Sequence, residues 1–167
     1  MGRAQRFFAN LSGAWFLLRR AFAPAVLDEM TRAIADGERR HKGEVCFAVE
    51  ARLSPWDVLE GLDARRRAEQ VFAQLRVWDT EHNCGVLFYV LLAEHRIEIV
   101  ADRGIAAAVP QAEWDAICAR MRECFARGEW REGSLGGIGA AHELLARHFP
   151  GDGAGRPDEL PDRPVLL

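Results

Sequence analysis

The middle of the chain holds two neighbouring segments with the composition of β-strands. CGVLFYVLLA is almost wholly apolar, RIEIVAD alternates between apolar and polar positions, and a short polar turn around Glu94 and His95 separates them. Two strands joined by so short a turn must run antiparallel. We therefore predict a hairpin with strands near 84–92 and 96–101, and we expect its turn to be exposed, as most hairpin turns are.

A third strand is predicted near 44–50, where EVCFAVE forms an apolar run typical of strands that are buried on both faces. A long helical segment separates this strand from the hairpin. Such a crossover favours a parallel pair with a right-handed connection. The three strands together predict a small mixed sheet.

Helical periods fill most of the remaining chain. Pro24 opens one helix, a capping box SPWD beginning at Ser54 opens a second, and Pro110 opens a third. A glycine-rich link, GSLGG, is expected to be a flexible connector to a last helix. The order of elements predicts an α/β domain at 23–150, followed by an extended C-terminal tail at 151–167.

Residues 1–22 are predicted to form a separate amphipathic helix. Arginines surround its apolar face, and its longest uncharged run is too short to span a bilayer. Two interpretations are open: the helix packs on the domain, or it lies on a membrane surface or on a partner through residues 3–22. The apolar face consists of Phe7, Phe8, Leu11, Trp15 and Leu18.

Composition narrows the classes of partner and cofactor. The 167 residues carry a formal net charge of −3, with acids and bases mixed along the chain, so we expect no nucleic-acid partner. No dinucleotide fingerprint is present, so no organic cofactor is expected. The four cysteines lack the paired spacing of metal ligands and suit buried thiols in a reducing, cytoplasmic compartment.

Hairpin geometry predicts where polar residues gather. The end of the second hairpin strand returns to the start of the first, which brings Asp102 and Arg103 beside the loop WDTEHN. If the strand at 44–50 is parallel to the first hairpin strand, its beginning reaches the same edge. That edge then gathers four carboxylates: Glu44, Asp79, Glu81 and Asp102.

Carboxylates with neighbouring hydroxyl and amide oxygens are the ligands that Ca²⁺ or Mg²⁺ requires. We therefore take the four carboxylates as candidate metal ligands, with Thr80, Asn83 and Arg103 as candidate ligand-binding residues. The alternative is structural. In that case Asp79 and Thr80 cap the end of the preceding helix and the turn, while Asp102 pairs with Arg103 or with another arginine.

Two other polar groups are expected to be solvated. His142 and His148 lie six residues apart on the last helix, rather than the three or four that would bring two metal ligands together, and are expected near the surface. The run Arg65, Arg66 and Arg67 is expected to form a solvated helix face rather than an anion-binding patch.

Several of these segments together resemble the TPM-domain family. The shared residues include Trp78 to Glu81, Asn83, the run IEIVADRGI, Trp114 and the motifs GGI and HFP. The resemblance covers roughly residues 38–150 and is to the small bacterial branch without a signal peptide. It implies a three-layer α/β/α sandwich around a small mixed sheet, divalent-metal binding and, for a plant member, a weak acid phosphatase activity. Where many exported members have Gly-x-Gly-Leu, this chain has Asp102 to Ile105, so the phosphatase chemistry does not carry over directly.

The favoured hypothesis is a TPM-like accessory or binding domain whose acidic edge holds a divalent metal ion. The first alternative is a metal-assisted phosphomonoester hydrolase in which Arg103 offsets the developing charge. The second alternative is a scaffold that is associated with the membrane surface through its first helix. The resemblance also implies a membrane-associated coiled-coil partner of the LemA type, which would make the protein peripheral to the membrane.

Overall fold

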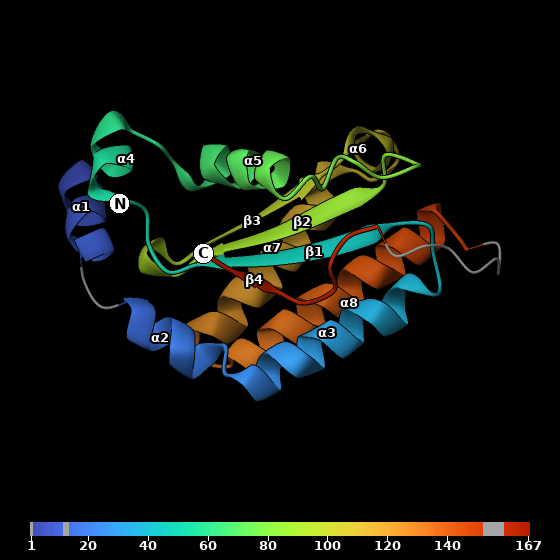
Figure 1. The fold of residues 1–167 in the computed structure, drawn as a ribbon, viewed down its shortest axis with the longest axis horizontal. Coiled ribbons are helices and arrows are strands. Elements are labelled where there is room, and N and C mark those ends of the chain that lie inside the picture. Colours follow the sequence, from blue (N-terminus) through green and yellow to red (C-terminus); the bar gives the residue numbers. More distant parts are fainter. Residues whose placement is uncertain (1, 12–13, 152–158) are drawn as a thin grey trace.

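The computed structural model describes residues 2–11, 14–151 and 159–167. Within this part of the chain the sheet has four strands in the order β3-β2-β1-β4 (Figure 1). β1 (Glu44–Glu50) pairs in parallel with β2 (Gly85–Leu91), and β2 pairs in an antiparallel manner with β3 (Arg96–Ala101). The predicted hairpin, its parallel neighbour and the mixed sheet are therefore confirmed.

The fourth strand comes from the C-terminal tail. β4 (Val165–Leu166) pairs in parallel with β1, where Val165 lies opposite Ala48. The backbone N–H of Leu167 donates to the carbonyl oxygen of Val49 at 2.8 Å, which continues this pairing to the end of the chain. The end of the tail, which the sequence suggested was only extended, thus adds an edge to the sheet.

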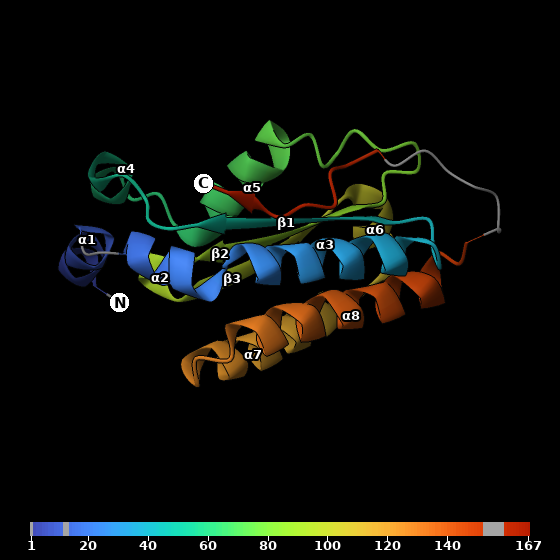
Figure 2. The ribbon, with the colours of Figure 1, turned by 60° about the horizontal axis from the view of Figure 1, so that its bottom comes forward.

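Helices cover both faces of the sheet in three layers (Figure 2). α3 (Pro24–Glu38), α7 (Gln111–Ala126) and α8 (Trp130–His148) lie on one face, and α5 (Ala64–Gln74) lies on the other. The remaining helices stand at the ends of the strands. They are α1 (Arg3–Leu11), α2 (Ala14–Ala21), α4 (Pro55–Glu60) and α6 (Arg103–Ala108).

Alternation along the strands divides the core between the two faces of the sheet. Val45, Phe47 and Val49 pack with the helices of the α3, α7 and α8 layer, whereas Cys46 and Ala48 pack with α5. All seven residues of β1 are buried, as its continuous apolar sequence predicts for a strand covered on both sides.

Local sequence accounts for the two helices of the crossover between β1 and β2. The side-chain oxygen of Ser54 accepts a hydrogen bond from the backbone of Asp57 at 3.1 Å, which begins α4 as the capping box predicts. Gly61 ends that helix with a φ of 85°, a left-handed conformation that glycine adopts without strain. Asp63 then caps α5 by accepting from the backbone of Arg66 at 2.8 Å.

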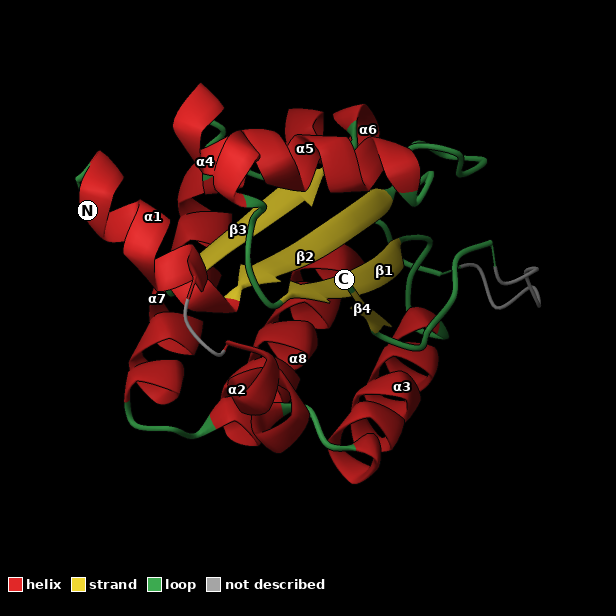
Figure 3. Ribbon diagram, turned by 60° about the vertical axis from the view of Figure 1, so that its left-hand side comes forward, coloured by secondary structure: helices red, strands yellow, loops and turns green. Residues whose placement is uncertain are grey.

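The segment predicted as one amphipathic helix is formed as two. Residues 12–13, between α1 and α2, lie outside the described part of the chain. α1 packs on α4 and on the short 3-10 turn η1 (Leu92–Glu94) of the hairpin, and α2 packs on the same turn. Figure 3 shows α1, α2 and α4 at the end of the molecule where β1 ends and the hairpin turns.

The glycine-rich link expected between the last two helices is instead part of α8. Glycine is a poor helix former in isolation. Here it permits contact: a Cβ added to Gly137 would lie 2.4 Å from the sulfur of Met121, and one added to Gly133 would lie 2.7 Å from the ring of Phe125. Close packing of α7 against α8 therefore overrides the local preference, and the connector prediction is wrong.

Candidate functional site

Three neighbouring strands bring Glu44, Gly85 and Asp102 into one row at the edge predicted to be acidic. Glu44 is the register partner of Gly85, and the backbone N–H of Asp102 donates to the carbonyl oxygen of Gly85 at 2.8 Å. Directly opposed residues on neighbouring strands share a face of the sheet. The register therefore assigns both carboxylates to the face covered by α5.

Both carboxylates of this row are removed from solvent, with Glu44 5% exposed and Asp102 8% exposed. One oxygen of Asp102, Oδ1, accepts a hydrogen bond from the backbone of Arg103 at 2.7 Å, where α6 begins. Its other oxygen, Oδ2, is buried and has no hydrogen-bond partner among the described residues. An oxygen in this state costs free energy unless a proton, a water molecule or a cation satisfies it.

Gly85 leaves space between the two carboxylates, and the backbone of Val77 fills part of it. The carbonyl oxygen of Val77 lies 1.9 Å from the position that a Cβ on Gly85 would occupy. Any side chain at this position would collide with the backbone. The glycine thus allows the loop before β2 to cross the sheet directly over this row.

The candidate ligand-binding residues of the loop hold the loop itself together. The hydroxyl of Thr80 accepts from the backbone of Cys84 at 2.9 Å, and the side-chain oxygen of Asn83 accepts from Nε of Arg103 at 2.8 Å. Asn83 adopts a φ of 52°, and its carbonyl oxygen accepts from the backbone of Gly104 at 3.1 Å. These bonds tie the loop to the beginning of α6, beside Asp102.

The other two candidate carboxylates lie on the solvent side of the loop. Asp79 and Glu81 are both exposed, and the backbone N–H of Glu81 donates to the carboxylate of Glu159 at 3.1 Å. No three His, Cys, Asp or Glu side chains converge as metal ligands anywhere in residues 2–11, 14–151 or 159–167. The structure therefore separates the four carboxylates into a buried pair, Glu44 and Asp102, and an exposed pair.

Sequence reasoning missed two further acids near Glu44. The pKa of Glu38 is raised to about 9: burial is the largest cause, a hydrogen bond from the backbone of Val45 opposes the rise, and the nearby carboxylates of Glu44 and Asp162 add to it. Glu38 therefore keeps its proton at neutral pH. No spacing in the sequence signals this cluster, because Glu38 ends a helix and Asp162 belongs to the tail.

His142 is buried rather than near the surface, which corrects the prediction from its spacing. Its Nδ1 lies 2.7 Å from Nε2 of His41, and the two rings are stacked. Because the backbone of Gly43 donates to Nδ1 of His41, the proton of His41 is on Nε2 and is donated to His142. Burial, followed by the charge of Arg40, lowers the pKa of His142 to about 4. His142 is therefore neutral at neutral pH, and the geometry of the pair fits packing.

The arginine run is only partly solvated. Nε and Nη2 of Arg67 donate to the two carboxylate oxygens of Glu50 at 2.8 and 3.0 Å, and the hydroxyl of Tyr89 donates to the same carboxylate at 2.6 Å. This network joins α5 to β1 and β2 on the face that α5 covers. Arg67 is thus a structural ion-pair residue, which the expectation of a uniformly solvated face did not foresee.

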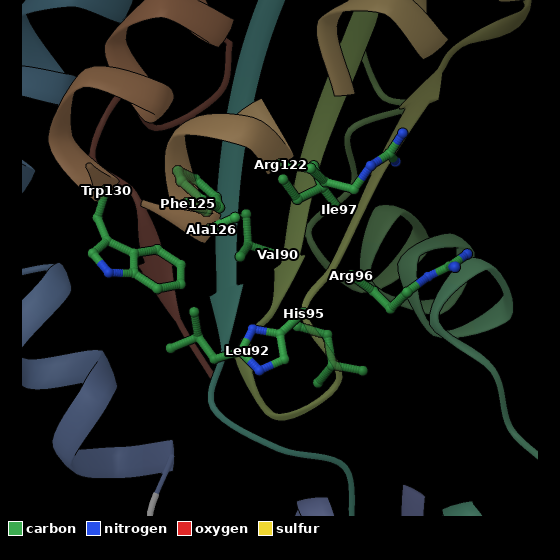
Figure 4. A pocket seen from close by; sticks show the side chains of 10 residues that line it. Val90, Leu92, His95, Arg96, Ile97, Arg122, Phe125, Ala126 and Trp130 are labelled. Atoms are coloured by element: carbon green, nitrogen blue, oxygen red, sulfur yellow. The ribbon is translucent and has the colours of Figure 1, made fainter. Parts of the chain in front are cut away.

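The hairpin turn at the opposite edge is not uniformly exposed as predicted. Glu94 is buried and binds α1, whereas His95 is exposed in a left-handed conformation with a φ of 51°. Next to His95 lies a cavity of about 230 Å³ (Figure 4). Its walls are mainly apolar side chains of the hairpin, the end of α7 and the beginning of α8, including Phe125 and Trp130, and its lining contains no carboxylate. Its polar lining residues are His95, Arg96 and Arg122, so the cavity offers no carboxylate ligand for a cation.

Comparison with known proteins agrees with this fold. A family model described as the TPM domain matches residues 19–144. The structure is similar to that of the BA42 protein from the psychrophilic bacterium Bizionia argentinensis, with 29% sequence identity, a TM-score of 0.75 and coverage of 86% of this chain and 93% of that one.

The N-terminal domain of a P. gingivalis protein shares the fold at 19% identity, with a TM-score of 0.62 and coverage of 77% of this chain and 81% of that one. No curated protein matches the sequence significantly. The family match spans most of the chain and contains the hairpin, the WDTEHN loop and the buried row. The protein therefore belongs to the TPM-domain family.

Proposed function

We propose that this protein is a non-catalytic binding domain that holds a divalent cation at the buried row of Glu44 and Asp102. The observation that carries the proposal is Oδ2 of Asp102, a buried carboxylate oxygen without a hydrogen-bond partner in the described part of the chain. A hard cation would satisfy this oxygen, because Ca²⁺ and Mg²⁺ are bound by oxygen ligands.

The spacing of the row supports a site with two carboxylates. Neighbouring strands lie roughly 5 Å apart, so positions two strands apart are separated by roughly 10 Å. A glutamate and an aspartate that reach toward each other can bridge that distance through one cation. Mg²⁺ commonly uses only one or two carboxylates and keeps several water ligands. The carbonyl oxygen of Val77, over Gly85, adds an oxygen of the same kind.

No observation in the described residues favours the hydrolase alternative. Metal-assisted phosphate hydrolysis requires a positioned nucleophile and a charged group that is free to meet the developing charge. One oxygen of Asp102 caps α6, and Nε of Arg103 is bound to Asn83. Both groups serve the local structure, so binding rather than turnover is the function that we propose.

The proposal is tested by thermal unfolding with MgCl₂ or CaCl₂ titrated into the metal-free protein. When the free cation concentration is a hundred times its Kd, a cation that binds only the folded state stabilises that state by about 2.7 kcal/mol. For a chain of this size, this raises Tm by about 5–10 °C. Asp102→Asn should abolish the rise. Asparagine has nearly the same shape and keeps an oxygen to accept from Arg103, so the cap of α6 is preserved.

Asp79→Asn is the matched control, because Asp79 is an exposed carboxylate of the same edge outside the buried row. It should leave the cation-dependent rise unchanged. If the Tm of the wild type changes with neither cation, the proposed function is ruled out. A rise that survives in Asp102→Asn but disappears in Asp79→Asn moves the site to the exposed loop.

A further inference from the structure

Large apolar side chains are exposed on α1, α2 and α4, the helices at one end of the molecule (Figure 1). Phe16 and Trp56 are each 75% exposed, and four similar residues accompany them. Six of the eight large apolar residues that are exposed in the described part of the chain belong to this group. We call it the aromatic end; it consists of Phe8, Leu11, Trp15, Phe16, Trp56 and Leu59.

The aromatic end differs from the apolar face read from the sequence. Two members of that face turn inward, because Leu18 is buried in the core and Phe7 packs against the α5 side of the sheet. Two exposed residues were not part of the predicted face: Phe16 of α2, and Trp56 of α4, which is distant in sequence. The exposed apolar surface therefore remains after the helices have packed on the domain.

Polar contacts hold α1 firmly in this position. Asn10 is fully buried; its side-chain amide donates to Glu94 at 2.9 Å, and its side-chain oxygen accepts from the backbone of Leu53 at 2.7 Å. Nε of Arg6 donates to the same carboxylate at 2.8 Å. Since α1 is fixed by these bonds, Phe8 and Leu11 are presented to solvent by an anchored helix.

The charge around the aromatic end is positive on its N-terminal side. Residues 1–27 contain four arginines and no acid. Arg19 and Arg20 are exposed in the last turn of α2, one helical turn after Trp15 and Phe16. α4 carries two acids: Asp57, whose carboxylate accepts a hydrogen bond from Ser54, and the exposed Glu60.

We propose that the aromatic end docks on the surface of an anionic lipid bilayer. Tryptophan and phenylalanine insert at the boundary between headgroups and acyl chains, and flanking arginines bind anionic headgroups. Two exposed tryptophans, and two exposed arginines on the same helix as Trp15, match this chemistry. No described helix has the length and hydrophobicity of a membrane span. The docking is independent of the cation proposed at Asp102, a residue that lies at the other end of the strands.

The test is flotation of the full chain with vesicles of phosphatidylcholine alone or of phosphatidylcholine mixed with phosphatidylglycerol. All samples contain a chelator, so that no divalent cation bridges protein and lipid. The wild type should float with the anionic vesicles and much less with the neutral ones. The double variant Phe16→Ser, Trp56→Ser should reduce binding by at least about tenfold.

Trp78→Ser is the matched control. Trp78 is 51% exposed, against 53% for Trp15, but it is the first residue of the WDTEHN loop at the opposite edge. This variant should float like the wild type. Arg19→Gln with Arg20→Gln should weaken binding to anionic vesicles and leave the small binding to neutral vesicles unchanged, which separates the electrostatic part from the apolar part.

Three results would overturn the inference. They are the absence of flotation by the folded wild type, equal flotation of the double variant, and a wild-type dimer that the double variant converts to a monomer. The last result would assign the aromatic end to self-association. Circular dichroism melts of each variant establish that it is folded, as expected for side chains that are this exposed.

Discussion

His142 shows how burial fixes the protonation state of a residue. Its ring fits beside Gly37, where an added Cβ would lie 2.1 Å from a ring atom, and its Nδ1 accepts from His41. A positive charge in this place would lose its hydration and would also face Arg40. The folded protein therefore binds a proton at His142 less readily than the unfolded chain does.

The contribution of His142 to stability should consequently fall in mild acid, whereas that of Glu38, whose folded pKa is raised, grows as the pH falls through the same range. The pKa of His142 is about 4 when folded and about 6.5 when unfolded, so its contribution is complete above pH 6.5 and is lost as the pH falls toward 4. The loss is about 3 kcal/mol at most. Relative to His142→Phe, which keeps a ring but does not titrate, the wild type should lose unfolding free energy, measured by urea, as the pH falls over this range. The same pH dependence of the unfolding free energy in the two proteins would contradict a pKa of about 4 for His142.

The pair of helices α7 and α8 depends on glycines that local rules would place in a loop. Gly137 lies against Met121, whereas Gly139, on the same helix, has no atom within 4 Å of an added Cβ. The two positions differ in their neighbours and share the same helical backbone. Packing, rather than helix propensity, therefore decides what each position accepts.

Gly137→Leu should destabilise the protein by about 1–3 kcal/mol, because the larger side chain must push α8 away from α7. Gly139→Leu should be neutral or stabilising by up to about 1 kcal/mol, because leucine is the better helix former and meets open space. Chemical denaturation of both variants measures the difference. Equal changes in unfolding free energy at the two sites would show that the contact with Met121 does not determine which side chain position 137 accepts.

One end of the domain is held together by contacts between distant parts of the chain. Glu94, in the hairpin turn, binds Arg6 and Asn10 of α1, more than eighty residues earlier in sequence. The ion pair is mostly buried, so removing one partner leaves the other uncompensated. Glu98, on β3, pairs with Arg96 in a more exposed setting.

Glu94→Ala should therefore destabilise the protein by about 3 kcal/mol and make α1 the first segment cut in limited proteolysis. Glu98→Ala, the control, should cost less than about 1 kcal/mol and leave the order of cleavage unchanged. Mass spectrometry of the first fragments reads out the result. Retention of an intact N-terminus in Glu94→Ala would show that apolar packing alone holds α1.

Much of the candidate site follows from hairpin geometry. Asp102 could be located beside the WDTEHN loop because a two-strand register is a local property that the apolar pattern and the short turn determine. The same reasoning brought Glu44 to that edge through the parallel crossover. It could not distinguish the buried carboxylates from the exposed Asp79, because burial depends on which backbone crosses the row, and that backbone is Val77.

By itself, the sequence determined the strands, the capped helices and the α/β class, since each rests on a period or a capping residue within a few positions. Only the tertiary structure decided the rest. It buried His142, made GSLGG part of α8, added β4 to the sheet and packed α4, which carries Trp56, against α1. The physical reason is the same in each case: the free energy comes from contacts between segments that are far apart in sequence, and no local pattern records them.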